Sequence, residues 1–103
     1  MRILVRSLKK PGGLVSNSDS RQLVSGYVVL GPGKEVGEHE TGGGEELITF
    51  IEGAAEVSFG KRKKMVHSPA VVLTPAHTPH NVKNNSKKPV KYVYTYIMAM
   101  DNS

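Results

Sequence analysis

Residues 33–53 read GKEVGEHETGGGEELITFIEG, and this stretch carries the strongest indications of the fold. Three glycines at positions 42–44 separate His39 from Glu46. Because glycine adopts tight-turn conformations without steric cost, the run predicts a hairpin turn that leads into a buried strand over residues 45–53. If the two segments pair as an antiparallel hairpin, the side chains of His39 and Glu46 can converge on one face of it.

A second stretch, residues 69–84, reads PAVVLTPAHTPHNVKN and carries His80 after a proline-rich turn. This histidine would have to come from a third strand. Two neutral imidazoles and one ionised carboxylate suit divalent iron, manganese, nickel, cobalt or zinc, and three protein ligands leave open positions for water and substrate. We therefore predict a divalent transition metal as cofactor, with His39, Glu46 and His80 as its ligands.

The rest of the chain continues as short strands. Polar and apolar residues alternate over residues 54–59, and no window has a sustained helical period. Further strands are predicted at residues 2–6, 22–30, 65–67, 70–74, 81–83 and 90–98, with turns at residues 11–13 and 60–64. The sequence therefore predicts an all-β protein, either a sandwich or a small barrel.

The last predicted strand is apolar on both faces. Tyr92, Tyr94, Tyr96 and Met98 share one face, and Val93, Thr95 and Ile97 share the other. Such a strand is either central in a packed sheet or covered by a partner subunit. The tyrosine row could line a ligand cavity or belong to a core or an interface, and the sequence does not choose between these readings.

Length and composition indicate one ordinary globular domain over residues 1–103, with 38% apolar residues and a net charge of +5. The longest apolar runs are far shorter than the ~20 residues of a spanning helix, so no membrane partner is expected. The first five residues form too short a run for a secretion signal, and a cytoplasmic location is expected by default.

The residue types present limit the chemistry. The chain has no cysteine, so a metal would have to be held by histidine and carboxylate. Seven glutamates and no lysine or arginine lie between Glu35 and Glu56, which raises the local concentration of cations. The basic run at residues 61–64 has no interleaved aromatic residues, so it is interpreted as a solvated turn and no nucleic-acid partner is expected.

The spacing of both stretches resembles the motifs of the cupin family. The first motif maps onto Gly33, His39, Thr41, Glu46 and Gly53, with Thr41 where the family has a second histidine. The second maps onto Pro69, Pro75, His77, His80 and Asn84, with Pro69 and His77 in place of glycines. The resemblance implies one cupin domain (motifs at 33–53 and 69–84) with a double-stranded β-helix, a jelly-roll barrel with a metal at its mouth, and a homodimer.

Three residues beside the predicted ligands have alternative roles. Thr41 is a poor metal ligand, but its hydroxyl could orient a metal-bound water. Glu45 is adjacent to Glu46, and neighbouring strand residues face opposite ways, so only one of them can reach the metal. His77 is a turn residue able to adopt positive φ, a contact at the cavity rim, or a replacement fourth ligand.

Three functions are consistent with these features, and no catalytic residue is identified. The first is a metal-dependent cupin enzyme acting on a small polar molecule as a dioxygenase, isomerase or lyase. The second is a non-catalytic module that binds or senses a sugar-like small molecule in the same cavity. The third is an interaction role through the tyrosine strand. An alternative to every metal-dependent function is that the barrel has these histidines but binds no metal.

Overall fold

The computed structural model describes residues 3–98, which form eight strands and no helix. No segment of this part of the chain qualifies as a membrane-spanning helix. In chain order the strands are β1 (Gly12–Val15), β2 (Leu23–Leu30), β3 (Glu46–Glu52), β4 (Ala54–Phe59), β5 (Arg62–His67), β6 (Ala70–Thr74), β7 (His80–Lys83) and β8 (Val90–Ile97). The all-β prediction is confirmed.

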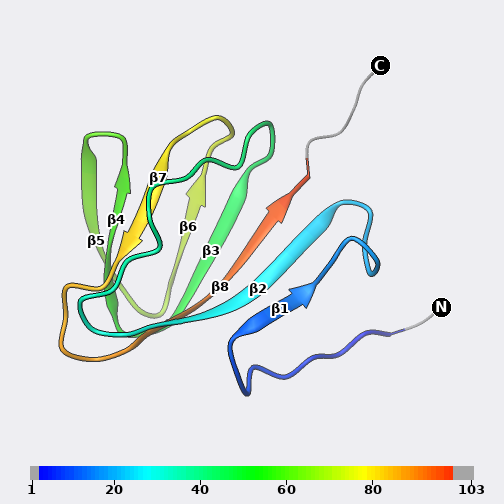
Figure 1. Cartoon of the computed structure of the whole chain (residues 1–103), viewed down its shortest axis with the longest axis horizontal. Helices are drawn as coiled ribbons and strands as arrows, with labels where there is room; N and C mark the ends of the chain where they lie inside the picture. The colour runs from blue at the N-terminus through cyan, green and yellow to red at the C-terminus, as the bar shows by residue number, and fades with distance from the viewer. Residues whose placement is uncertain (1–2, 99–103) are drawn as a thin grey trace.

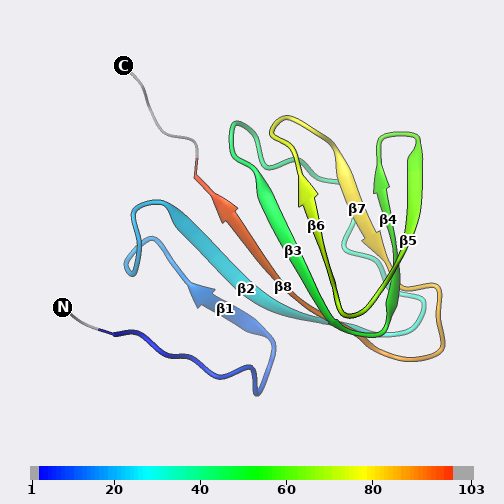
Figure 2. The same ribbon diagram turned by 180° about the vertical axis from the view of Figure 1, so that it is seen from behind.

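The strands form two antiparallel sheets (Figures 1 and 2). The larger sheet has the order β1-β2-β8-β3-β6, and the smaller has the order β5-β4-β7. β8 hydrogen-bonds to β2 on one side and to β3 on the other, so the strand that is apolar on both faces is central in its sheet. Two facing antiparallel sheets with crossovers between them make up the predicted double-stranded β-helix.

The core lies between the two sheets and follows the two-residue alternation of each strand. In β3, Ile48 and Phe50 are buried while Leu47 is exposed. The buried apolar side chains come from both sheets and include Leu30, Ile48, Phe50, Ala55, Val57, Val66, Val82, Val90 and Tyr92. The rings of Phe50 and Tyr92 lie 5.3 Å apart, an ordinary aromatic contact within this core.

Two of the motif residues have structural roles. Gly53 has a φ of 88°, and a Cβ atom built there would lie 2.5 Å from the carbonyl oxygen of Pro89. The buried side-chain amide of Asn84 donates to the carbonyls of Leu30 and Lys88, each at 2.8 Å. Gly53 therefore permits a close approach of backbones, and Asn84 ties together the loops that follow β2 and β7.

The structure corrects the N-terminal part of the prediction. Residues 3–6 are not a strand, and Arg2 lies outside the described residues. Instead β1 begins at Gly12, within the predicted turn, and pairs with β2 through Gly12 and Tyr27. Apolar composition favoured the earlier run, but an edge strand needs a partner in register, and β2 supplies that partner to Gly12–Val15.

The basic turn is also shorter than predicted. Residues 62–64 belong to β5 and pair with β4, which leaves only Gly60 and Lys61 in the turn. The three basic side chains remain exposed as expected, because β5 is the edge strand of the smaller sheet.

The predicted hairpin between the segments of His39 and Glu46 is wrong. Glu46 begins β3 in the larger sheet, whereas His39 forms a bridge with His80, whose strand β7 is in the smaller sheet. A second bridge joins Glu35 to Lys83 along the same line. The glycine run therefore carries the chain from one sheet to the other, and the two side chains converge from opposite layers.

Candidate metal centre

His39 is held by backbone contacts to His80. Each of the two residues donates its N–H to the carbonyl of the other, at 3.0 Å from His39 and 2.9 Å from His80. This pairing places the two imidazole rings with their centroids 4.2 Å apart. Residues distant in sequence are therefore brought together by one antiparallel bridge.

Both imidazoles are oriented in the same way. Nδ1 of His39 lies 2.9 Å from the carbonyl oxygen of Gly37, and Nδ1 of His80 lies 2.9 Å from that of Thr78. A carbonyl oxygen only accepts, so each Nδ1 carries the hydrogen and donates. Each neutral ring is then left with Nε2 as its free electron-pair donor, which is the usual orientation of metal-binding histidines.

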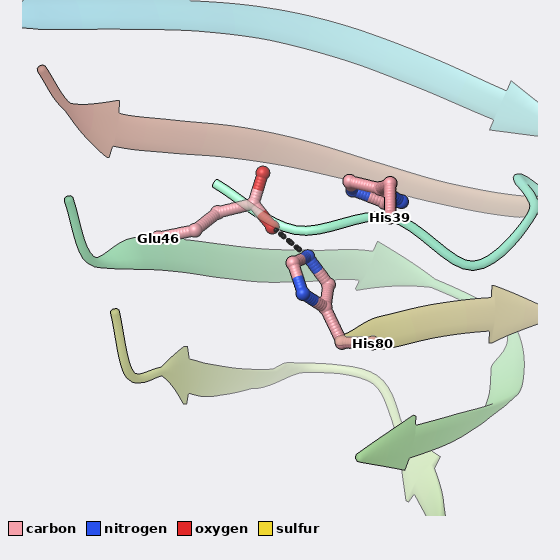
Figure 3. A group of neighbouring side chains, drawn as sticks. All are labelled: His39, Glu46 and His80. Carbon is pink, nitrogen blue, oxygen red and sulfur yellow. Dashed lines mark hydrogen bonds and ion pairs between the residues drawn. The ribbon is translucent and has the colours of Figure 1, made fainter. Parts of the chain in front are cut away.

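Glu46 projects toward these rings from the start of β3 (Figure 3). Its side chain is almost fully buried, and Oε1 lies 2.8 Å from Nε2 of His80, which is itself fully buried. The candidate ligand atoms of His39, Glu46 and His80 all lie within 4.8 Å of one another. The structure thus brings together the three predicted ligands.

The contact between Glu46 and His80 has a chemical consequence. Because Nδ1 of His80 donates to Thr78, a neutral His80 meets the carboxylate with an electron pair on Nε2. Two acceptors at 2.8 Å repel unless a proton or a cation lies between them. The donor set, two imidazoles and a carboxylate without thiolate, fits a divalent transition metal.

One further buried polar atom lies at this position. Thr74 of β6 is directly opposite Glu46 in the sheet, and its fully buried hydroxyl has no hydrogen-bond partner among residues 3–98. Unpartnered buried hydroxyls are rare in folded proteins and are commonly satisfied by water or a bound group. This hydroxyl is consistent with a centre that holds more than protein atoms.

A cavity of about 540 Å³ opens beside the three residues. Its lining combines aliphatic, tyrosine and acidic side chains: Val28, Val36, His39, Glu40, Thr41, Glu46, Ile48, Val82, Tyr92, Tyr94 and Tyr96. The tyrosine row of β8 therefore lines the cavity, one of the readings that the sequence left open. Glu40 was not predicted, although its place between His39 and Thr41 could have suggested it.

The tyrosines remain neutral in this environment. Burial raises the pKa of Tyr92 well above its ordinary value, and the nearby Glu46 carboxylate adds to the effect. Burial also raises the pKa of Tyr94, helped by Tyr96 and Glu46. Their phenol groups therefore keep their hydrogens at neutral pH and face the cavity as weakly polar, uncharged groups.

The residues next to the three candidate ligands have separate positions. Thr41 lines the cavity, and its hydroxyl donates to the carbonyl of Gly44 at 2.7 Å. Glu45 is exposed, as the strand alternation predicted. Thr41 therefore lies at the cavity, whereas Glu45 is on the solvent side.

His77 has the predicted turn conformation, with a φ of 55°, and it is not one of the residues that line the cavity. Its N–H donates to the carbonyl of Gly42 at 2.7 Å, and its Nδ1 lies 3.5 Å from Oε1 of Glu40. The group of side chains within metal-binding distance of one another does not include it. His77 therefore connects the turn before β7 to the loop after His39.

Known proteins share this architecture. A predicted oxalate decarboxylase from Thermotoga maritima superimposes with a TM-score of 0.83 at 17% identity, covering 94% of this chain and 100% of that one. A Cupin 2 conserved barrel domain protein from Salinispora arenicola gives 0.78 at 19% identity, covering 93% and 89%. The Cnp3 cupin domain of Schizosaccharomyces pombe gives 0.79 at 18% identity over 86% of this chain. At these identities the likeness shows the fold alone.

The chain spans 64% of the length of the Schizosaccharomyces pombe domain. None of the curated proteins compared with the chain matches it. Residues 26–96 match the family model described as a cupin domain, which is more than half of the chain and includes His39, Glu46 and His80. The chain therefore belongs to the cupin family.

Proposed function

We propose that this protein is a metal-dependent cupin that binds a divalent transition metal through His39, Glu46 and His80 and accepts a small molecule in the adjoining cavity. The single observation that carries the proposal is the convergence of the three side chains from two sheets, with both Nδ1 atoms already engaged by backbone carbonyls. Two oriented Nε2 atoms and a buried carboxylate are a prepared donor set.

When bound, the ion would supply Lewis-acid chemistry or, if it is redox-active, an oxidation, on a substrate in its open positions. The protein itself contributes binding and exclusion of water. Ile48, Val82 and the tyrosines provide an apolar wall, and Glu46 completes the lining, with the buried His80 in contact with its carboxylate. An isomerase, lyase or dioxygenase activity is therefore proposed in preference to hydrolysis by a protein nucleophile.

A non-catalytic binding module is the second candidate, and one observation favours it. Thr41 replaces the second histidine of the family motif, so the protein offers three ligands where the family pattern has four. The cavity of about 540 Å³ would serve a sensor as well as an enzyme. Turnover of a bound compound by the metal-loaded protein distinguishes the two.

The metal proposal is tested with His80→Ala and the matched control His77→Ala. Both proteins are purified, stripped with a chelator, reloaded with Zn(II) and analysed for bound metal by mass spectrometry. Wild type and His77→Ala should each hold about one ion, while His80→Ala should lose affinity by more than the roughly 10- to 100-fold that loss of an outer hydrogen-bonding partner costs. Equal zinc content in wild type and folded His80→Ala would refute the assignment.

We also propose a homodimer that forms through the outer face of the larger sheet. Five exposed side chains from four strands lie there: Leu23, Leu47, Val71, Leu73 and Ile97. Along this face of the central strand β8, the one charged side chain is Lys91, and it pairs with Glu52 at 3.5 Å. A monomer rarely exposes a contiguous apolar patch of more than a few hundred Å², so we propose that a second copy of the chain covers these side chains.

A further inference from the structure

The lining of the cavity, as far as residues 3–98 form it, includes no lysine or arginine side chain. The chain has 14 lysines and arginines, yet none lines the cavity in the part of the chain that the structure describes. The ionisable groups in the lining other than tyrosine are His39, Glu40 and Glu46. An anionic ligand would therefore find no cationic side chain with which to pair.

Charge balance leads to the same conclusion when the proposed ion is included. A divalent ion with the Glu46 carboxylate leaves a charge of +1, and the Glu40 carboxylate brings the sum to zero. A neutral ligand keeps the cavity neutral, whereas a dianion leaves two uncompensated negative charges in a partly buried site. The cavity is therefore matched to a compound without net charge.

The shape and polarity of the lining favour a ring. The rings of Tyr94 and Tyr96 are nearly parallel, with centroids 6.2 Å apart and planes inclined by 10°. The aliphatic part of the lining consists of Val28, Val36, Ile48 and Val82. Aromatic surfaces gain about 0.5–1.5 kcal/mol by contact with another aromatic ring beyond the burial of area alone. A flat ring uses these surfaces better than a flexible polyol does.

Gly26 determines where Tyr94 lies. The two residues are directly opposite in β2 and β8, and a Cβ atom at Gly26 would lie 2.4 Å from the Tyr94 hydroxyl and 2.5–2.6 Å from the adjacent ring carbons. The ring of Tyr94 thus rests over β2, in space that any other residue type would fill. An alanine at Gly26 would displace the phenol ring of Tyr94, which is one of the cavity's walls.

We propose that the cavity binds a neutral, planar ring compound carrying oxygen donors, and that Gly26 keeps the ring site open by accommodating Tyr94. The part of this proposal that directs the oxygens to an ion rests on the proposed metal function. The ring site itself does not, because the valines, Ile48 and the tyrosines that build it are not among the proposed metal ligands.

The ring site is tested on metal-free protein under nitrogen, by titration with three compounds monitored by protein NMR. Catechol and cis-cyclohexane-1,2-diol are a matched pair that differ in aromaticity, and oxalate represents the small dianions. Catechol should bind about three- to tenfold more tightly than the saturated diol, and oxalate should not bind. Equal affinity for the two diols, or tighter binding of oxalate, would overturn the proposal.

Gly26→Ala tests the second half without changing any residue of the lining. It should weaken catechol binding by about the same three- to tenfold and should lower the melting temperature. In Gly26→Ala/Tyr94→Ala the displaced ring is absent, so the two substitutions together should cost less stability than the sum of their separate costs. If Gly26→Ala fails to fold, Tyr94→Leu provides the test, since it removes the aromatic surface from unchanged backbone. Unchanged catechol affinity in whichever of these single variants folds would refute the role of the Gly26–Tyr94 pair.

Zinc separates the two proposals. Ring binding in metal-free protein together with absence of zinc binding would refute the metal function and leave the ring site in place. Zinc binding without a preference for the aromatic diol would refute the ring site and leave the metal function in place.

Discussion

Oε1 of Glu46 lies 2.8 Å from Nε2 of His80, and both side chains are buried. With Nδ1 of His80 donating to the carbonyl of Thr78, this distance requires a shared proton in the metal-free protein. The same two atoms are the ones that would face an ion. Proton and metal are therefore expected to compete for one position.

Zinc binding should consequently release protons. The reason is that the ion takes the position between Glu46 and His80 at which a proton would otherwise lie. Affinity should fall as the pH is lowered, since protons then compete more strongly. Isothermal titration calorimetry in two buffers of different ionisation enthalpy measures the release, and a heat independent of buffer would contradict the prediction.

Glu46→Gln is the control for this experiment. The amide can donate a hydrogen bond to Nε2 of His80 without a shared proton, so the variant should fold and release fewer protons when it binds any zinc. Release equal to that of wild type would assign the proton to another group.

Tyr92 should make the protein sensitive to alkali. Burial raises the pKa of Tyr92 in the folded protein, whereas in the unfolded chain it ionises near its ordinary value of about 10. Below that value the phenol is neutral in both states and contributes no pH dependence. As the pH rises further, the unfolded chain ionises first, so the free energy of unfolding should fall by up to about 1.4 kcal/mol per pH unit.

Urea denaturation of wild type and Tyr92→Phe between pH 9 and 11 tests this expectation. The phenylalanine variant should lose most of the slope that Tyr92 causes. Parallel stability profiles of the two proteins would show that Tyr92 ionises alike in both states.

Gly53 and Gly60 form a matched pair for a test of stability. Both have positive φ, 88° and 59°, but a Cβ at Gly53 meets the Pro89 carbonyl at 2.5 Å, while a Cβ at Gly60 meets nothing within 4 Å. Gly60→Ala should cost about 1 kcal/mol, the conformational penalty alone. Gly53→Ala should cost clearly more, because backbone atoms must also move. Chemical denaturation giving equal losses would contradict the close approach at Gly53.

The outer face of the larger sheet predicts the state of association. Wild type should sediment as a dimer at micromolar concentration, and Leu73→Lys should raise the dissociation constant by roughly 100-fold or more, since an unpaired buried charge costs about 3 kcal/mol or more. Met65→Lys, at an exposed position of similar accessibility on the smaller sheet, is the control and should remain dimeric. If the wild-type protein sediments as a monomer, the proposed dimer interface is refuted.

Much of the strand pattern could be predicted because it is local. Residues 54–59, 70–74 and 90–97 alternate between buried and less buried positions or are apolar throughout, and these segments are β4, β6 and β8. Residues 3–6 have the same composition but no strand partner, and β1 forms instead where β2 is available in register. Composition reports the propensity of a segment to be extended, whereas pairing depends on what lies beside it.

Part of the candidate site could likewise be predicted from the sequence, and part of it could not. The motif spacing was sufficient to nominate His39, Glu46 and His80, while the alternation rule established only that Glu45 and Glu46 cannot both be ligands. The route by which they meet was predicted wrongly, because His39 pairs with His80 beside the smaller sheet and not with the segment of Glu46. The position of Gly26 beneath Tyr94 depends on cross-strand register, which no local pattern specifies.

The sequence by itself determined an all-β cupin chain with two histidines and a glutamate at motif spacing, because strand period and motif spacing are properties of neighbouring residues. Only the tertiary structure decided that Glu46 and His80 come from different sheets, that both imidazoles present Nε2, and that three tyrosines line a cavity to which no lysine or arginine of residues 3–98 contributes. These features arise from the packing of two sheets against each other, which brings together atoms that are far apart along the chain.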